Sequence, residues 1–150
     1  MSKSVTKLNF FIALNLPSAF FCGVRIKSID QSICITFVRY KWINKNPFNS
    51  MYWAVQGMAA ELATGALVLS KINKTKKNIS MLVVGSKVKF NKKARGVISF
   101  SCDQGLLVDN ALKNAIETNE STEITLNAQG KNCNGEIVSK FSFVWSLKVK

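Results

Sequence analysis

The residue of this chain best placed to do chemistry is Glu61. It is the only aspartate or glutamate between Asp30 and Asp103. It stands within the stretch from Ser50 to Ser70, which is apolar on every side and therefore predicts a helix that is buried all round. An ionised carboxylate in such a helix is costly unless it is paired, shifted in pKa, or used. Catalysis by this carboxylate is one reason for its placement.

The residues that share the helical face of Glu61 have small or hydroxyl side chains. Ala54, Gly57, Thr64 and Gly65 lie three, four or seven positions from it. Glycines let a ligand or another backbone come close, although each costs a helix roughly 1 kcal/mol relative to alanine. The alternative is that the glycines admit a closely packed sheet and that Glu61 pairs with a basic side chain elsewhere.

The start of the same helix offers a second chemical group. Asn49 or Ser50 is its predicted N-cap. The free N–H groups near Tyr52, Trp53 and Ala54 would carry partial positive charge, so they could hold an anion or a developing oxyanion. A carboxylate within a helix and an oxyanion site at its start suit the hydrolysis of an acyl group.

Several other kinds of site are excluded by composition. The chain has no histidine, which rules out Ser-His and Cys-His nucleophile pairs and the common zinc spacings. No metal site is predicted. The cysteines are Cys22, Cys34, Cys102 and Cys133, and their wide spacing shows no CxxC pair. We expect them to be reduced and buried in a cytoplasmic protein.

The charge of the chain is strongly positive and unevenly distributed. Its formal net charge is +13, and residues 62–102 contain eight lysines and one arginine without an acid. Such a field attracts a polyanion: nucleic acid, an anionic bilayer surface, or a ligand that carries phosphates. The alternative is a solvated surface that serves solubility. Within this stretch, Lys92, Lys93 and Arg95 crowd one predicted turn.

The N-terminal part of the chain predicts a helix that packs on the domain. Its apolar residues follow Lys3 and Lys7 as in a signal peptide, but Asn9, Asn15 and Pro17 interrupt them. The segment is also too short and too polar to span a membrane. We therefore expect residues 1–23 to be a helical segment of one domain that covers residues 1–150, with no transmembrane segment.

The remaining pattern predicts one α+β domain. Residues 24–42 alternate as an extended segment, and the long helix is predicted to end at residues 71–73. Strands at 79–90 and 96–102 are predicted to form a hairpin through the turn 91–96. A short helix near Val108 and strands at 124–128 and 137–149 follow. The predicted architecture is a curved antiparallel sheet of five or six strands wrapped around one long apolar helix.

The segment before Glu61 resembles a known family. The sequence NPFNSMYWA at residues 46–54, followed by Glu61, is similar to the N-x-x-G-x-x-H-G-G…D/E motif of hotdog-fold acyl-CoA thioesterases, in particular the phenylacetyl-CoA thioesterase group. The resemblance runs over residues 24–149, and it is closest to a poorly characterised thioesterase-like branch. The chain departs from the motif where the family has histidine, since Tyr52 stands there, and where it has two glycines, since Trp53 and Ala54 stand there.

The resemblance implies a fold and a set of roles. It implies the hotdog fold and thioester hydrolysis, with Glu61 acting either as a general base on water or as a nucleophile. Asn46 would orient water or substrate, the N–H of Trp53 would stabilise the oxyanion, and Thr64 could assist. The family assembles as dimers, so a homodimer or a dimer of dimers is implied.

The coenzyme A part of the substrate is the only cofactor-like group that the resemblance implies. Coenzyme A carries several phosphates, and the turn of Lys92, Lys93 and Arg95 is the candidate to meet them. A hairpin tip exposed to solvent is the alternative interpretation of that turn.

Two other functions compete with catalysis. A hotdog module could bind acyl-CoA or a fatty acyl chain without turnover, and the missing histidine favours this. Nucleic-acid binding would need aromatic stacking platforms beside the lysines. The aromatic candidates fall at strand periodicity and are expected in the core, so binding to nucleic acid is disfavoured.

Overall fold

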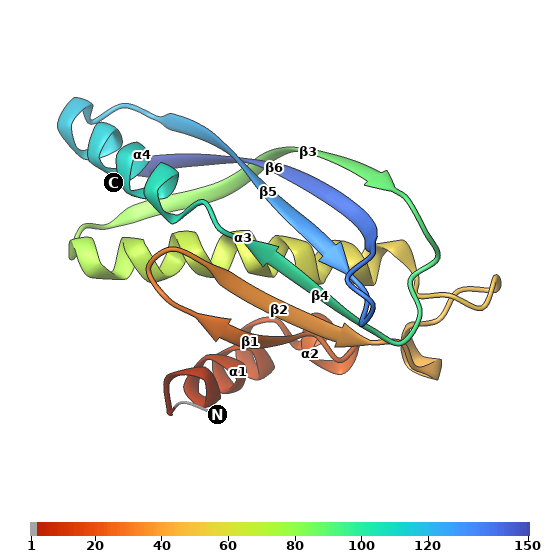
Figure 1. Cartoon of the computed structure of the whole chain (residues 1–150). Helices are drawn as coiled ribbons and strands as arrows, with labels where there is room; N and C mark the ends of the chain where they lie inside the picture. The colour runs from red at the N-terminus through yellow and green to blue at the C-terminus, as the bar shows by residue number, and fades with distance from the viewer. Residues whose placement is uncertain (1–2) are drawn as a thin grey trace.

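A single long helix lies along the concave face of a six-stranded antiparallel sheet (Figure 1). The computed structural model describes residues 3–150, with side chains from residue 5 onward; Met1 and Ser2 of the predicted N-terminal segment lie outside this range. The helix is α3 (Trp53–Thr75). The strands are β1 (Arg25–Ile29), β2 (Cys34–Arg39), β3 (Ile79–Phe90), β4 (Val97–Cys102), β5 (Thr122–Lys131) and β6 (Ile137–Val149). Their order across the sheet is β1-β2-β4-β5-β6-β3, which confirms the predicted hotdog fold.

The strand periodicity of the C-terminal third is confirmed by burial. In β5, Ile124, Leu126 and Ala128 are buried and the residues between them are exposed. In β6, Phe141, Phe143 and other inward residues are buried against α3. The two strands pair along almost their whole length. A sheet with one apolar face therefore packs on the helix, as its period of two requires.

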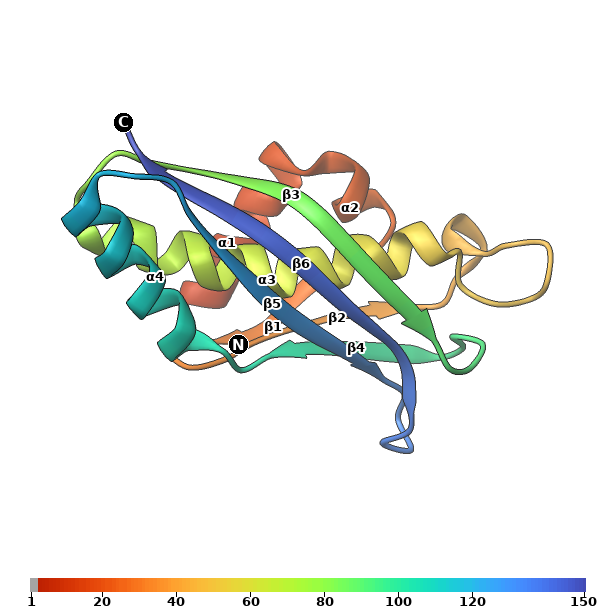
Figure 2. The same ribbon diagram turned by 90° about the horizontal axis from the view of Figure 1, so that it is seen from above.

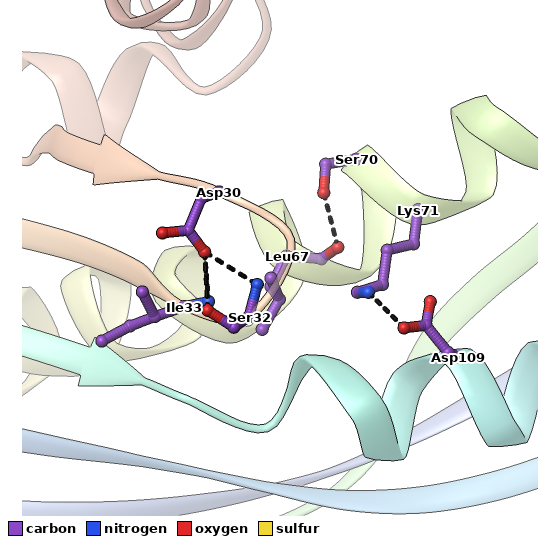
Figure 3. A network of polar contacts seen from close by, with 7 residues as sticks. All are labelled: Asp30, Ser32, Ile33, Leu67, Ser70, Lys71 and Asp109. Carbon is purple, nitrogen blue, oxygen red and sulfur yellow. Dashed lines mark hydrogen bonds and ion pairs between the residues drawn. The ribbon is translucent and has the colours of Figure 1, made fainter.

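Two predictions about the strands are wrong. Residues 24–42 form two strands rather than one extended segment, because Asp30 accepts hydrogen bonds from the backbone N–H groups of Ser32 and Ile33 and closes a turn (Figure 3). The predicted hairpin of residues 79–102 does not form either. β3 pairs with β6, whereas β4 lies between β2 and β5. The connection from residue 91 to residue 96 crosses to the middle of the sheet instead of turning back.

The start of α3 also differs from the prediction. Asn49 and Ser50 do not cap the helix, which begins at Trp53 after Tyr52 and without a side-chain cap. The reason is that Asn46 holds the loop before it: its Oδ1 accepts from the N–H groups of Phe48 and Ser50. Asn49 takes the left-handed conformation, with φ at 56°, in that loop. The helix continues to Thr75, a few residues beyond the predicted end.

Two N-terminal helices cover the side of α3 that the sheet leaves open (Figures 1 and 2). They are α1 (Lys3–Asn15) and α2 (Pro17–Phe21). Asn9 fixes α1 to the edge of the sheet, because its side chain donates to the carbonyl of Ile26 at 3.0 Å and accepts from the N–H of Ile26 at 2.9 Å. Val5 and Ile12 of α1 are buried.

The last helix, α4 (Gly105–Thr118), packs near the C-terminal end of α3. Lys71 of α3 donates a hydrogen bond to Asp109 of α4 at 2.6 Å (Figure 3). The lysine side chain is only 5% exposed and the aspartate is 53% exposed. The buried amine of Lys71 is therefore paired with a carboxylate that remains in contact with solvent. Across residues 3–150, every helix falls short of the length and hydrophobicity that a membrane span needs.

All four cysteines are free thiols, but the prediction that all are buried is wrong for Cys133, which is exposed, and for Cys22, which is half-buried. Cys34 and Cys102 are buried at paired positions of β2 and β4. Burial raises the pKa of the Cys34 thiol to about 12, so it remains protonated at neutral pH.

Candidate functional site

The carboxylate of Glu61 stands without a partner. Among the side chains of residues 5–150, none forms an ion pair or a hydrogen bond with it, so no compensating basic side chain is found in that range. The side chain is partly buried in the middle of α3. Burial raises the pKa of this carboxyl above its ordinary value, because the apolar surroundings disfavour the charged form. A carboxyl whose pKa is raised by burial is a candidate for proton exchange in a reaction.

The two glycines beside Glu61 have different surroundings. A Cβ at Gly65 would lie 3.1 Å from the indole ring of Trp145 and 3.3 Å from Oε1 of Glu61. A Cβ at Gly57 would meet only the ring of Phe141, at 3.6 Å. The interpretation that these glycines admit a packed sheet is therefore confirmed for Gly65. Because one carbon placed there would touch both groups, the edge of the Trp145 indole also lies near the carboxylate of Glu61.

Thr64 faces the sheet rather than open space. Its side chain is fully buried, accepts a hydrogen bond from Nε1 of Trp145 at 3.0 Å, and donates to the carbonyl of Glu61 at 2.9 Å. The hydroxyl thus holds the indole in place beside Gly65. Trp145 was not singled out as a site residue from the sequence. Its period-two position in the last strand indicated only that it faces the core.

The first turn of α3 presents free donors, as predicted for Trp53 and Ala54. No protein acceptor lies at the N–H of either residue among the described residues. The N–H of Tyr52 differs, because it donates to the carbonyl of Asn44 at 2.8 Å. Only the N–H groups of Trp53 and Ala54 are therefore available to an oxyanion, because those of Val55 and Gln56 already donate to the carbonyl of Tyr52.

Asn46 lies in the loop that leads into α3, and both ends of its amide are engaged. Its Nδ2 donates to Oγ of Ser50 at 3.0 Å, and its Oδ1 accepts from the N–H groups of Phe48 and Ser50. The side chain still lines a cavity of about 500 Å³, together with Trp53 and Lys93. In this structure Asn46 shapes the loop beside the helix start.

The three basic residues of the 91–96 connection are not equivalent. Lys92 forms an ion pair with Glu136. Lys93 donates to the carbonyl of Phe48 at 3.3 Å, and Arg95 donates to the carbonyl of Asn49 at 2.9 Å. Lys93 and Arg95 therefore lie against the loop before α3 and keep their charges unpaired by acids within the described residues.

Three cavities follow one another along α3. The first is the cavity at Asn46 and Lys93, and Trp53 lines both it and a second cavity of about 380 Å³. The second cavity contains Ala54, Gly57 and Glu61. Glu61 in turn lines a third cavity of about 250 Å³, which lies under α1. The basic loop, the free N–H groups and the carboxylate are thus arranged in series.

No gathering of three or more histidine, cysteine, aspartate or glutamate side chains able to hold a metal ion occurs in residues 3–150. The groups that remain are one carboxylate, one set of backbone donors and a basic loop. Together they could bind an acyl compound through its carbonyl and deliver a water molecule or a carboxylate oxygen to it.

Comparison with known proteins places this architecture among solved structures. It is similar to a protein of unknown function and probable thioesterase from Pseudomonas aeruginosa, with a TM-score of 0.80 and 21% identity over 97% of this chain and 96% of that one. It is also similar to a protein of unknown function from Chlorobaculum tepidum, with a TM-score of 0.84 and 19% identity over 98% and 95% of the two chains.

A third similar structure is a variant of a thioesterase enzyme from Staphylococcus aureus, with a TM-score of 0.64 and 13% identity over 89% of this chain and 98% of that one. Two variants of that protein carry alanine at a glutamine and at a glutamate that lie fifteen residues apart. At these identities the likeness shows the fold.

Comparison of the sequence gives one family and no curated relative. The family model described as a domain of unknown function, DUF4442, matches residues 7–147, and the chain therefore belongs to the DUF4442 family.

Proposed function

We propose that this protein is an acyl-CoA thioesterase in which Glu61 is the catalytic carboxylate. The observation that carries the proposal is the position of Glu61: an unpartnered, partly buried acid between a cavity that begins at free helix N–H groups and a cavity with apolar walls. A thioester has a carbonyl that needs a donor, a thiol part that leaves, and an acyl part that needs apolar surroundings. Each of these needs has a counterpart along α3.

In the general-base form of the reaction, Glu61 takes a proton from water while the water oxygen bonds to the thioester carbon. The carbonyl oxygen becomes an oxyanion that accepts a hydrogen bond from the N–H of Trp53. The C–S bond then breaks, and the thiolate receives the proton from Glu61. The products are a carboxylic acid and the free thiol of coenzyme A. In the alternative form, a Glu61 oxygen attacks the carbon, the C–S bond breaks and the thiolate leaves, which gives an anhydride; water then hydrolyses the anhydride to the carboxylic acid and restores the Glu61 carboxyl.

The spacing along the helix is compatible with this division of roles. Trp53 and Glu61 are eight residues apart, which corresponds to about 12 Å of helix rise. Because side chains on a helix lean toward its N-terminus, the carboxylate reaches back into this interval. The rest of the interval has room for a carbonyl and a water molecule. The separation of Asn46 from Glu61 also equals that of the two residues replaced in the Staphylococcus aureus thioesterase.

Coenzyme A would approach from the loop before α3. Lys93 and Arg95 lie against that loop and carry charges suited to phosphate groups. Lys92 is a weaker candidate, since Glu136 already neutralises it. Asn46 would serve by holding the loop that these cations contact.

A second copy of the chain would complete the assembly. β3 is an edge strand, and its outer side carries exposed apolar residues, among them Leu82, Val84 and Val88. Such an edge invites pairing with another strand. Ser86 and Val88 of this strand also line the second cavity, the one that contains Gly57 and Glu61. A copy paired along β3 would therefore lie beside the site. We propose a homodimer formed through β3, alone or within a dimer of dimers.

The alternative is a module that binds acyl-CoA without turnover. It is favoured by Tyr52 at the place where the motif has histidine, and by the amide of Asn46 being engaged within its own loop. Both functions use the same cavities, and they differ in whether the C–S bond breaks.

The deciding experiment is release of free thiol from a panel of acyl-CoA thioesters by the purified protein. We expect saturable hydrolysis by the unchanged protein and a loss of about a hundredfold or more in Glu61→Gln and Glu61→Ala, a range typical of removing a general base. Glu120→Gln serves as the control because Glu120 is exposed and remote in sequence from α3. Hydrolysis that survives both Glu61 substitutions would exclude the catalytic role, and tight binding without thiol release would establish the binding module.

A further inference from the structure

The cavity under α1 has one ionisable side chain, Glu61, at one end and mostly hydrocarbon walls. One side is formed by Leu8, Phe11 and Leu16 of the N-terminal helices and the short link between them; the other is formed by Leu62, Ala66 and Leu69 of α3. Glu61 is the only ionisable group among the residues that line it. The lining continues along α3 as far as Asn73, about 18 Å of helix rise from Glu61. The cavity is therefore elongated along the helix.

Three amide or hydroxyl side chains line this cavity; Asn15 and Ser70 bond to their own helices, and Asn73 lies at the end far from Glu61. Asn15 donates to the carbonyl of Phe11 at 2.9 Å, and Ser70 donates to the carbonyl of Leu67 at 2.8 Å. A ligand there finds few hydrogen-bonding groups away from Glu61. The matching ligand has one polar end, placed at Glu61, and an apolar remainder that is longer than it is wide.

The size of the cavity limits the length of that remainder. Its volume is about 250 Å³. At about 30 Å³ for each water-sized unit, a group of about eight heavy atoms fills it. An unbranched chain of about eight carbons suits the elongated shape better than a single aromatic ring, which would fill a short, wide space.

From these observations we infer that α1 is the outer wall of an acyl-chain site that selects unbranched acyl groups of about eight carbons. The identity of the group held at Glu61 rests on the proposed thioesterase function, whereas the chain site rests on the cavity. Ile12 and the two hydrogen bonds of Asn9 hold α1 against the domain, so this wall is fixed in place.

The inference predicts how affinity depends on chain length. Each methylene removed from water contributes about a fourfold gain in affinity. Between a butyl and an octyl chain we therefore expect a gain of about a hundredfold or more. Longer chains should gain little, because the added carbons lie outside the cavity.

The test uses S-alkyl thioethers of coenzyme A, with butyl, hexyl, octyl, decyl and dodecyl chains, titrated by calorimetry into the protein of residues 1–150. A thioether has no carbonyl and is not hydrolysed, so binding is read separately from turnover. Leu8→Trp narrows the cavity, and Leu14→Trp is the matched control on the same helix, because Leu14 is 66% exposed and does not line it.

We expect Leu8→Trp to weaken octyl binding by about tenfold or more, the equivalent of two displaced methylenes, while butyl binding stays unchanged. Leu14→Trp should match the unchanged protein. Leu8→Ala should move the preference toward decyl. If Leu8→Trp fails to fold, Ala66→Leu fills the same cavity from α3.

Two results overturn the inference: affinity that does not depend on chain length, or equal effects of Leu8→Trp and Leu14→Trp. These results are distinguishable from failure of the thioesterase proposal. A protein that binds thioethers with the expected length profile but hydrolyses no thioester keeps the acyl-chain site and loses the enzymatic function. A protein that hydrolyses thioesters of all lengths equally keeps the function and loses the chain site.

Discussion

The indole N–H of Trp145 donates to the hydroxyl of Thr64 at 3.0 Å, one turn along α3 from Glu61. The same hydroxyl donates to the backbone carbonyl of Glu61 at 2.9 Å. A side chain from the last strand is thereby fixed beside Gly65 and the catalytic candidate. The hydrogen bond joins the sheet to the helix beside the cavity under α1, which Trp145 lines.

Removing this hydrogen bond should destabilise the protein. In Thr64→Val the shape is kept, but Nε1 of Trp145 is left buried without an acceptor. We expect a loss of about 1–3 kcal/mol in the free energy of unfolding, measured by urea denaturation. Thr75→Val is the control, since the hydroxyl of Thr75 bonds only to backbone groups near the end of α3. Equal losses in the two variants would show that the contact with Trp145 contributes nothing specific.

The two glycines of α3 should respond oppositely to alanine. Gly57→Ala gains helix propensity and meets only an ordinary contact with Phe141, so we expect about 0.5–1 kcal/mol of added stability. Gly65→Ala meets Trp145, which its hydrogen bond to Thr64 holds in place. Strain should offset the propensity gain or exceed it, giving a loss of up to about 2 kcal/mol. Thermal unfolding of both variants tests this, and a Gly65→Ala protein as stabilised as Gly57→Ala would contradict it.

The ionisation of Glu61 should cost stability. Its folded pKa is raised, so the folded state binds a proton more tightly than the unfolded state does. Between about pH 4.3, where an unfolded glutamate titrates, and the higher folded pKa, stability falls as pH rises. Above the folded pKa the full cost persists. Glu61→Gln should therefore be more stable than the unchanged protein at about pH 8, and this advantage should shrink toward about pH 4.

Denaturation curves of Glu61→Gln and of the exposed control Glu120→Gln over this pH range give the comparison. An advantage of Glu61→Gln that is constant with pH would rule out ionisation as its cause.

Removing Asp109 should destabilise the protein more than removing Lys71, its partner in the ion pair. Asp109→Ala leaves the buried amine of Lys71 without a counter-charge, and we expect a loss of about 2–4 kcal/mol. Lys71→Met leaves Asp109 unpaired, but its side chain is 53% exposed to water. The methionine side chain fills the space of the lysine chain, so we expect a loss below about 1 kcal/mol in the free energy of unfolding. Urea denaturation of both variants measures these losses. A larger loss in Lys71→Met than in Asp109→Ala would contradict the prediction.

The edge strand predicts a change in assembly. Leu82→Lys combined with Val84→Lys places like charges along the exposed edge of β3, where two copies would pair. We expect a homodimer for the unchanged protein and a monomer for the double variant, each measured by light scattering after size-exclusion chromatography. Leu106→Lys is the control, because Leu106 is an exposed residue of α4, away from β3. A dimer that persists in the double variant would place its interface elsewhere.

Local patterns in the sequence determined much of the fold. The apolar run around Glu61 specified α3, because a helix without a polar face has to be covered on all sides. The alternation in residues 124–128 and 137–149 specified β5 and β6 and the direction of their side chains, because side chains of a strand alternate between its two faces. The isolated acid in α3 was visible at the same level, and so were the free N–H groups of Trp53 and Ala54, although the predicted cap at Asn49 or Ser50 is wrong.

Only the tertiary structure decided which strands pair and what surrounds Glu61. β3 was expected to pair with β4, its neighbour in sequence, yet it pairs with β6, because strand order depends on contacts between distant segments that a short connection does not encode. The same long-range packing brings Trp145 against Gly65 and pairs Lys92 with Glu136. It also places Leu8 in the wall of the cavity under α1, which Glu61 lines. Local periodicity states which face of an element is buried, and the folding of the whole chain chooses the partner that buries it.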